Sequence, residues 1–352
     1  MATIGQDWQG EQDWCGGLEP EIDGQMFAER PADPEMRESA SIWLYEENGE
    51  FAIPRVGIEA VGAIWDTHRY DANFAFADGR ALLESVTDAR SLSPIDAQGK
   101  ATILGAGGLS FQCLEPFRKW RVVYEGHPVD TTTADIIART IDDTRRTSLR
   151  YEVELTTVAP GWVHDNRPEK LAAMPEEERV AAGLMGFGWR VEQLVCAEGE
   201  VTIDGRSRAF SAVGNRVRRQ SVRPLGAFRG HCWQAATFPD GRGFAISCYP
   251  PLENGYVFND AYIFQDGRKY KARATRIPWL ERLMARGDDV SIELESELGT
   301  TRIAGSSELN TFRVGIAEMP GFTLQQGGAK YTWDGQTAYG MLERSSWEDR
   351  IA

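Results

Sequence analysis

The chain has 352 residues, a length that fits two domains, each large enough to bury a substantial core. It carries 38 Lys and Arg against 53 Asp and Glu, and its formal net charge of −15 argues against nucleic acid as a partner, because so acidic a surface repels phosphate backbones. No segment approaches the ~20 apolar residues of a membrane-spanning helix, which argues against stable membrane insertion.

The cysteines and histidines are scattered along the chain. The five cysteines are odd in number and form no C-x-x-C pair, which argues against a disulfide framework and a zinc site. The four histidines form no H-x-H or H-E-x-x-H pair. Since the N-terminus also lacks the basic start and apolar run of a signal peptide, we expect a cytoplasmic protein with no metal and no cofactor.

Short segments rich in β-branched and aromatic residues alternate with turn signals along the chain. Examples are "RYEVELTTV" at 150–158, "GFAISCYP" at 243–250 and "DVSIELESEL" at 289–298. The turn signals are Asn-Gly or Asp-Gly pairs, which favour tight hairpins. They occur at residues 48–49, 78–79, 204–205, 240–241, 254–255, 266–267 and 334–335. This pattern predicts a mainly β protein built from antiparallel barrels or sandwiches, with a few short helices.

Helical patterns occur at residues 130–143, 167–185 and 277–287. The second is rich in Ala, Glu and Leu and lies between two β-rich halves. We therefore expect two β-domains, one of residues 1–183 and one of residues 184–352.

The first polar and aromatic cluster lies in "IWDTHRYDANFAFADG", residues 64–79. In a strand Asp66, His68 and Tyr70 share one face. A carboxylate, an imidazole and a phenol within reach of one another can handle protons. The same three side chains are equally consistent with a buried hydrogen-bonded cluster that ties strands together.

The second cluster is "FRGHCWQAATFPDGRGF", residues 228–244, where His231 and Trp233 occupy alternate positions. Alternate residues of a strand share a face, so both rings point into a cavity or both point to solvent. Cys232 between them faces the opposite way, which argues against a cysteine nucleophile activated by His231.

The third cluster is "GYVFNDAYIFQDG", in which Tyr256, Phe258, Asp260 and Tyr262 have strand parity. An acid among aromatic rings in an apolar cavity has its pKa raised by burial and keeps a proton near neutral pH. Aromatic faces around it stabilise a developing carbocation. The alternative is an aspartate in a turn beside aromatic core residues.

Taken together, the sequence resembles the carotenoid 1,2-hydratase (hydroxyneurosporene synthase) family and its AttH-like relatives. The resemblance rests on diffuse β-signatures over most of the chain, at residues 54–82, 114–126, 188–205, 214–244 and 331–346. It implies two lipocalin-like β-barrels in tandem and a cofactor-independent reaction that uses a His-x-Trp pair and a Tyr-x-Asp pair. His231 and Trp233 match the first pair, whereas Phe258 stands where the second pair has its tyrosine, which leaves the carotenoid substrate open.

From the clusters and the resemblance we expect a cofactor-independent hydratase or dehydratase, isomerase or cyclase that acts on a hydrophobic terpenoid, steroid-like or aromatic substrate. In this hypothesis Asp260 protonates the substrate, His231 orients the acid or activates water, and Trp233 and Tyr256 shield the cation. Substrate contacts are expected from Asp66, His68, Tyr70, Phe258 and Tyr262. The alternative is a non-catalytic carrier of hydrophobic small molecules, and homo-oligomers are compatible with either.

Overall fold

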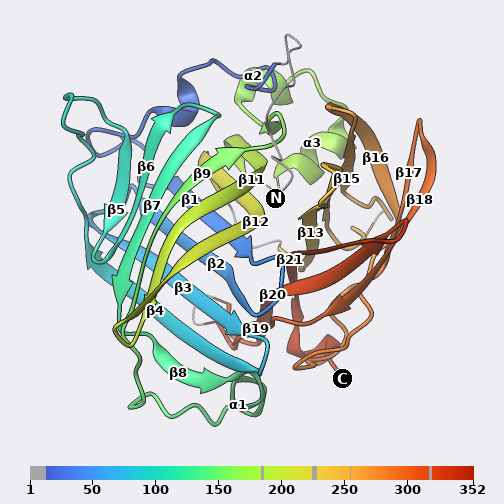
Figure 1. Cartoon of the computed structure of the whole chain (residues 1–352). Helices are drawn as coiled ribbons and strands as arrows, with labels where there is room; N and C mark the ends of the chain where they lie inside the picture. The colour runs from blue at the N-terminus through green and yellow to red at the C-terminus, as the bar shows by residue number, and fades with distance from the viewer. Residues whose placement is uncertain (1–12, 184–185, 224–227, 254, 317–318) are drawn as a thin grey trace.

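The computed structural model describes residues 13–183, 186–223, 228–253, 255–316 and 319–352 as two antiparallel sheets side by side (Figure 1). The first sheet consists of β1 (Met36–Tyr45), β2 (Phe51–Val61), β3 (Ile64–Phe76), β4 (Arg80–Arg90), β5 (Ile103–Ala106), β6 (Leu109–Glu115), β7 (Lys119–Gly126), β8 (Val129–Thr132), β9 (Leu149–Thr157), β10 (Trp162–Asp165), β11 (Phe187–Ile203) and β12 (Arg206–Val222). The second consists of β13 (His231–Thr237), β14 (Gly243–Cys248), β15 (Asn259–Gln265), β16 (Arg268–Arg276), β17 (Ile292–Ser296), β18 (Gly299–Ser307), β19 (Thr311–Val314), β20 (Phe322–Trp333) and β21 (Gln336–Trp347).

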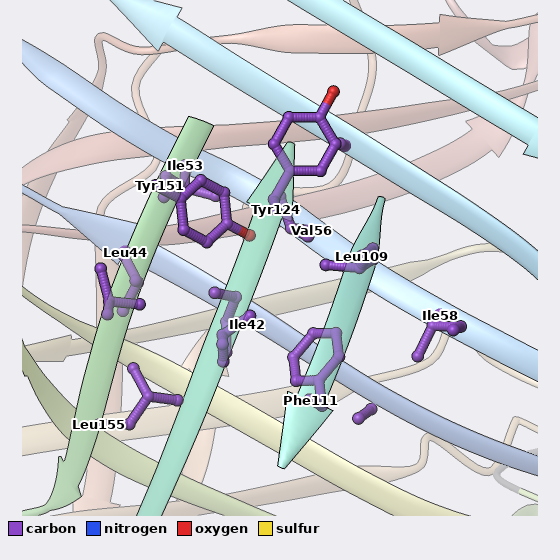
Figure 2. Packing of buried hydrophobic residues seen from close by; sticks show 14 of the residues in the cluster. Ile42, Leu44, Ile53, Val56, Ile58, Leu109, Phe111, Tyr124, Tyr151 and Leu155 are labelled. Carbon is purple, nitrogen blue, oxygen red and sulfur yellow. The ribbon is translucent and has the colours of Figure 1, made fainter. Parts of the chain in front are cut away.

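The first sheet runs in the order β5-β6-β7-β9-β11-β12-β1-β2-β3-β4-β8, and β10 pairs with β11. It curls around an apolar core until the end of β4 meets β5 at a bridge between Ser91 and Ala106. Figure 2 shows this core, in which Ile42, Val56 and Phe111 from three strands lie fully buried. Alternation along each strand leaves the other face free to contact the second sheet.

The second sheet closes into a barrel. Its strand order is β18-β17-β16-β15-β14-β13-β21-β20-β19, and β18 also pairs with β20, which completes the ring. The barrel interior is an apolar cluster that includes Cys232, Phe244 and Tyr331. The prediction of a mainly β protein built from antiparallel strands, with a few short helices, is confirmed.

The Asp-Gly pairs form the hairpins that the sequence predicts. Asp204-Gly205 joins β11 to β12, Asp266-Gly267 joins β15 to β16, and Asp334-Gly335 joins β20 to β21. In all three pairs both residues have positive φ, as a type I′ turn requires. The pair at 254–255 lies partly outside the described residues.

The helices are short: α1 (Thr133–Ala138), α2 (Pro168–Leu171) and α3 (Glu176–Gly183), with 3-10 turns at Ile22–Gly24 and Glu348–Arg350. In the part of the chain that the structure describes, no helix has the length and apolar character needed to cross a membrane. The helix expected at 277–287 is wrong. The structure has no helix in this segment, and the carbonyls of Pro278 and Trp279 accept hydrogen bonds from the buried Arg344 (3.2 and 3.1 Å).

The chain passes from the first sheet to the barrel between Val222 and His231, beyond the boundary expected at residues 183/184. The reason is that β11 and β12 fill the middle of the first sheet, where β11 pairs with β9 and β12 pairs with β1. The helical segment at 167–183 therefore connects strands of the same sheet.

The outer face of the first sheet packs against the outer face of the barrel. Trp43, Trp233 and Met341 belong to the apolar cluster at this interface. The Tyr45 hydroxyl donates to the carbonyl of Gly327 (2.6 Å), and the Asn73 amide donates to the side chain of Gln326 (2.6 Å). Both bonds are buried, so they fix how the two sheets meet.

Candidate active site

A cavity with two connected chambers lies between the first sheet and the barrel. The large chamber has a volume of about 480 Å³ and the small chamber about 80 Å³. Both are lined by Arg55, Glu59, Arg223, His231 and Glu343, which therefore stand where the chambers join. Clefts between two domains are common ligand sites.

Strand alternation brings His231 and Trp233 to this cavity. Both side chains leave β13 on the face toward the first sheet and line the small chamber. Cys232 points the other way into the barrel core, and burial raises the pKa of its thiol to about 11. The prediction that His231 and Trp233 share one face of a strand is confirmed.

His231 is held at both ring nitrogens. Its Nε2 lies 3.2 Å from Glu343 Oε1, and its Nδ1 lies 2.5 Å from the Ser345 hydroxyl. Burial raises the pKa of Glu343, but the hydrogen bond from His231 and the charge of Arg55 outweigh it and lower the pKa. Glu343 is therefore a carboxylate near neutral pH, and it can stabilise an imidazolium at His231.

Trp233 is packed on several sides. Its indole N–H donates to Glu192 (2.9 Å), its ring meets Trp43 edge to face with centroids 4.8 Å apart, and the Arg190 guanidinium lies over its ring at 4.5 Å. Since a cation already covers this ring, the structure offers no support for the expectation that Trp233 stabilises a substrate carbocation.

The walls of the large chamber differ in character. One part is apolar and is formed by Ile58, Val61, Ile64, Phe228, Phe322 and Leu324, among others. The other part is charged, with five arginines (Arg37, Arg55, Arg69, Arg223 and Arg313) against three carboxylates (Glu59, Asp71 and Glu343). The cavity is thus positive inside an acidic protein.

Asp260 lies two strands away from Trp233 in the same cross-strand row, since Trp233 pairs with Ser247 and Ser247 pairs with Asp260. Its carboxylate accepts hydrogen bonds from Trp162 Nε1 and from His164 Nε2, both at 3.1 Å. Burial raises the pKa of Asp260, but the hydrogen bond and charge of His164 outweigh it, so the pKa is lowered. The sequence predicted a raised pKa for Asp260, so the direction of this shift is opposite to the expected one. The hydrogen bonds from His164 and Trp162 to Asp260 connect β10 to β15.

The aromatic residues near Asp260 in the sequence do not form one cluster around its carboxylate. Tyr256 and Phe258 lie in the loop before β15, so strand parity begins only at Asn259. Phe258 contacts Tyr249, with centroids 5.2 Å apart, and Tyr256 is half-buried. Tyr262 is buried at the interface against Trp162, with centroids 5.1 Å apart.

Asp66, His68 and Tyr70 lie on the face of β3 that points away from the cavity. Asp66 is exposed, His68 is buried beside Trp65, and the Tyr70 hydroxyl donates to Glu84 (3.0 Å) inside the first sheet. The residues between and beyond them, Thr67, Arg69 and Asp71, line the large chamber instead. This placement matches the alternative of a structural hydrogen-bonded cluster for Tyr70.

The residues that sequence reasoning missed are Glu343, Ser345 and the arginines of the cavity. Glu343 and Ser345 come from β21, whose register places them beside Trp233 and His231. A signal for the arginines was present, because "NRVRRQSVR" puts several arginines on alternate faces of one strand in a chain that is otherwise acidic. Among the described residues, no group of three or more His, Cys, Asp or Glu side chains is placed to hold a metal ion.

Lys269, close to Asp260, makes the free energy of unfolding depend on pH, because its pKa differs between the folded and the unfolded chain. Its ammonium donates to the carbonyl of Gly161, and burial, opposed by Asp13 and Asp260, lowers its pKa to about 8 from an ordinary value of 10.5. Between these two values the unfolded chain binds a proton that the folded chain does not, so stability rises with pH there. We expect wild type to gain on the order of 2 kcal/mol relative to Lys269→Gln between pH 8 and 10.5, measured by urea unfolding. Parallel stability curves for the two proteins would show that burial does not lower the pKa of Lys269 in the folded chain.

The curled first sheet, the barrel packed back to back against it and the cavity between them define a protein of the AttH-like fold. Similar structures are a Nitrosomonas europaea protein assigned as AttH (TM-score 0.54, 14% identity, 94% of this chain and 100% of that one), CghA with Sch210972 (0.52, 12%, 95% of both) and kievitone hydratase from Nectria haematococca (0.49, 12%, 95% of both). The chain belongs to the family with the domain of unknown function DUF7064, whose family model matches residues 23–348. No curated protein sequence matches it.

Proposed function

We propose that this protein is a cofactor-independent acid–base enzyme that moves a proton on a largely apolar substrate held between its two sheets. The reaction class is hydration or dehydration, isomerisation or cyclisation. The observation that carries the proposal is the His231–Glu343 pair, which stands where the small chamber meets a large chamber with an apolar wall.

In this proposal His231 is the group that gives and takes the proton, in place of Asp260. An imidazole can both accept and release a proton, so it can act as a base and as an acid. Glu343, ionised and buried, stabilises its protonated form, and Ser345 holds the other ring nitrogen. The arrangement has the logic of a base oriented by a second group.

The charge of the cavity indicates which intermediate the protein stabilises. Arg55 and Arg223 stand at the same junction as His231. Guanidinium groups in a site shielded from solvent stabilise developing negative charge and disfavour a carbocation. We therefore propose proton transfer at a carbon next to a carbonyl, with an enolate-like intermediate that the arginines stabilise.

The proposal is supported by the solved structure of CghA with Sch210972, which shows that this fold can hold an organic ligand. The competing function is that of a carrier, which would need the cavity but no proton transfer.

The experiment that separates the two functions starts from small molecules that co-purify with the protein. They are released, identified by mass spectrometry and incubated with fresh protein. We expect conversion to a product that differs by one water or is an isomer with a changed retention time. A ligand that returns unaltered, with binding intact, would show a carrier and contradict the proposed enzyme.

A further inference from the structure

The arginines of β12 divide into two groups by the face on which they lie. Arg216 and Arg218 point into the first sheet, and each meets a buried carboxylate there: Arg216 contacts Asp23 (2.7 Å) and Arg218 contacts Glu38 (2.5 Å). Arg219 points the other way, and Arg219 and Arg223, just past the end of the strand, line the small chamber.

On the small-chamber side the arginines differ: Arg190 forms an ion pair with the buried Glu192, whereas Arg219 and Arg223 have no such carboxylate partner among the described residues. The small chamber is lined by four arginines (Arg55, Arg190, Arg219 and Arg223) and two carboxylates (Glu59 and Glu343). Because Glu192 neutralises Arg190, one positive charge remains in excess. Both carboxylates are already engaged, Glu59 by Arg37 (2.6 Å) and Glu343 by His231 (3.2 Å).

Arg219 and Arg223 are the clearest cases. Within the described ranges, neither has a carboxylate at ion-pair distance, unlike Arg216 and Arg218. The Nε of each is also buried with no hydrogen-bond partner. The Arg219 side chain belongs to a residue only 8% exposed, so solvent cannot replace the missing partner. Buried charges in proteins are normally paired, because an unpaired one costs the full loss of its hydration.

The electrostatics agree with this geometry. Burial first, and then the neighbouring Arg223 and Arg190, lower the pKa of Arg219 well below its ordinary value, and the charge of Glu59 only partly opposes them. An arginine nevertheless keeps its proton near pH 7. The positive charges that line the small chamber therefore repel one another, and an anion would relieve this repulsion.

We infer that the small chamber is an oxyanion-binding subsite that takes the carboxylate head of an amphipathic substrate, with Arg219 and Arg223 as its ligands. The apolar body of that substrate lies in the large chamber along Ile58, Val61, Phe322 and Leu324. Bidentate pairing between guanidinium and carboxylate supplies both affinity and orientation. Because His231 lines both chambers, the carbons nearest the carboxylate come to lie beside it.

This inference deepens the proposed function. The placement of the substrate carbons beside His231 for reaction rests on that function, whereas carboxylate binding by Arg219 and Arg223 does not. Its test is therefore a binding measurement. Isothermal titration compares dodecanoate with dodecanol, which has the same chain and no charge, and adds dodecyl phosphate and inorganic phosphate as further probes, all below micelle formation.

We expect wild type to bind dodecanoate at least about tenfold more tightly than dodecanol, as expected for hydrogen bonds to a charged group. Arg219→Gln and Arg223→Gln should each weaken dodecanoate binding about tenfold and leave dodecanol binding unchanged. Arg268→Gln is the matched control, because Arg268 is exposed on the outside of the barrel, and it should bind like wild type. Without ligand, Arg219→Gln should also melt at a higher temperature than wild type, since it removes the repulsion.

Equal binding of dodecanol and dodecanoate, or equal losses of both ligands in the arginine variants, would overturn the inference. Tighter binding of dodecyl phosphate than of dodecanoate would overturn the assignment of the head group as a carboxylate. Inorganic phosphate that binds as tightly as dodecanoate would overturn the need for an apolar body. Tight dodecanoate binding without turnover of any ligand would leave the subsite in place and contradict only the proposed enzyme.

Discussion

His231→Gln is expected to lower the turnover number by at least ~100-fold, the usual contribution of a positioned acid–base group. Glutamine keeps an N–H donor for the buried Glu343, so the carboxylate retains a partner, but an amide cannot accept and release a proton as an imidazole does. Turnover is measured on the ligand recovered from the purified protein, and thermal unfolding is followed in parallel.

The control for this variant is His127→Gln. His127 is exposed in the loop between β7 and β8, and its replacement should leave turnover and melting temperature as in wild type. Wild-type turnover in His231→Gln would place the chemistry elsewhere, and the His164–Asp260 pair would be the next group to test.

Asp23→Ala is expected to lower the free energy of unfolding by about 3–5 kcal/mol. Asp23 is fully buried, and its carboxylate accepts hydrogen bonds from Arg216 (2.9 and 2.7 Å), from the Trp120 indole (3.1 Å) and from the Phe117 amide (2.6 Å). Its removal leaves the Arg216 guanidinium as an uncompensated charge inside the first sheet. Urea unfolding at neutral pH measures the change.

Two further variants make this stability test specific. Asp88→Ala, at an exposed position of β4, should change stability by less than about 0.5 kcal/mol. The double variant Asp23→Leu with Arg216→Met should be more stable than Asp23→Ala, because it leaves no buried charge behind. A loss of less than about 1 kcal/mol in the free energy of unfolding for Asp23→Ala would contradict the claim that the buried Asp23–Arg216 ion pair stabilises the first sheet.

Local sequence signals predicted the features that depend on neighbouring residues. Pairs such as Asp204-Gly205 and Asp334-Gly335 mark hairpins because Asp and Gly tolerate the positive φ of a type I′ turn. The shared face of His231 and Trp233 follows from the two-residue period of a strand. Both inferences need only a few consecutive residues.

The features that sequence missed depend on contacts between distant segments. The period of β3 is visible in the sequence, but nothing local tells which face meets the barrel, and the cavity receives Arg69 and Asp71, whereas His68 and Tyr70 point away from it. The direction of the Asp260 pKa depends on His164, which comes from the other sheet. The partner of His231 is Glu343, more than a hundred positions later in the chain, and only the pairing of β13 with β21 brings the two together.

The most direct test of the central claim is the transfer of a solvent proton to carbon. The recovered ligand is incubated in heavy water with wild type, His231→Gln or His127→Gln, and carbon-bound deuterium is measured by mass spectrometry after back-exchange of O–H and N–H positions. The account predicts deuterium at carbon with wild type and His127→Gln, and a rate at least ~100-fold lower with His231→Gln. Ligand that binds to all three proteins and stays free of carbon-bound deuterium would contradict an acid–base enzyme and identify the cavity as a carrier site.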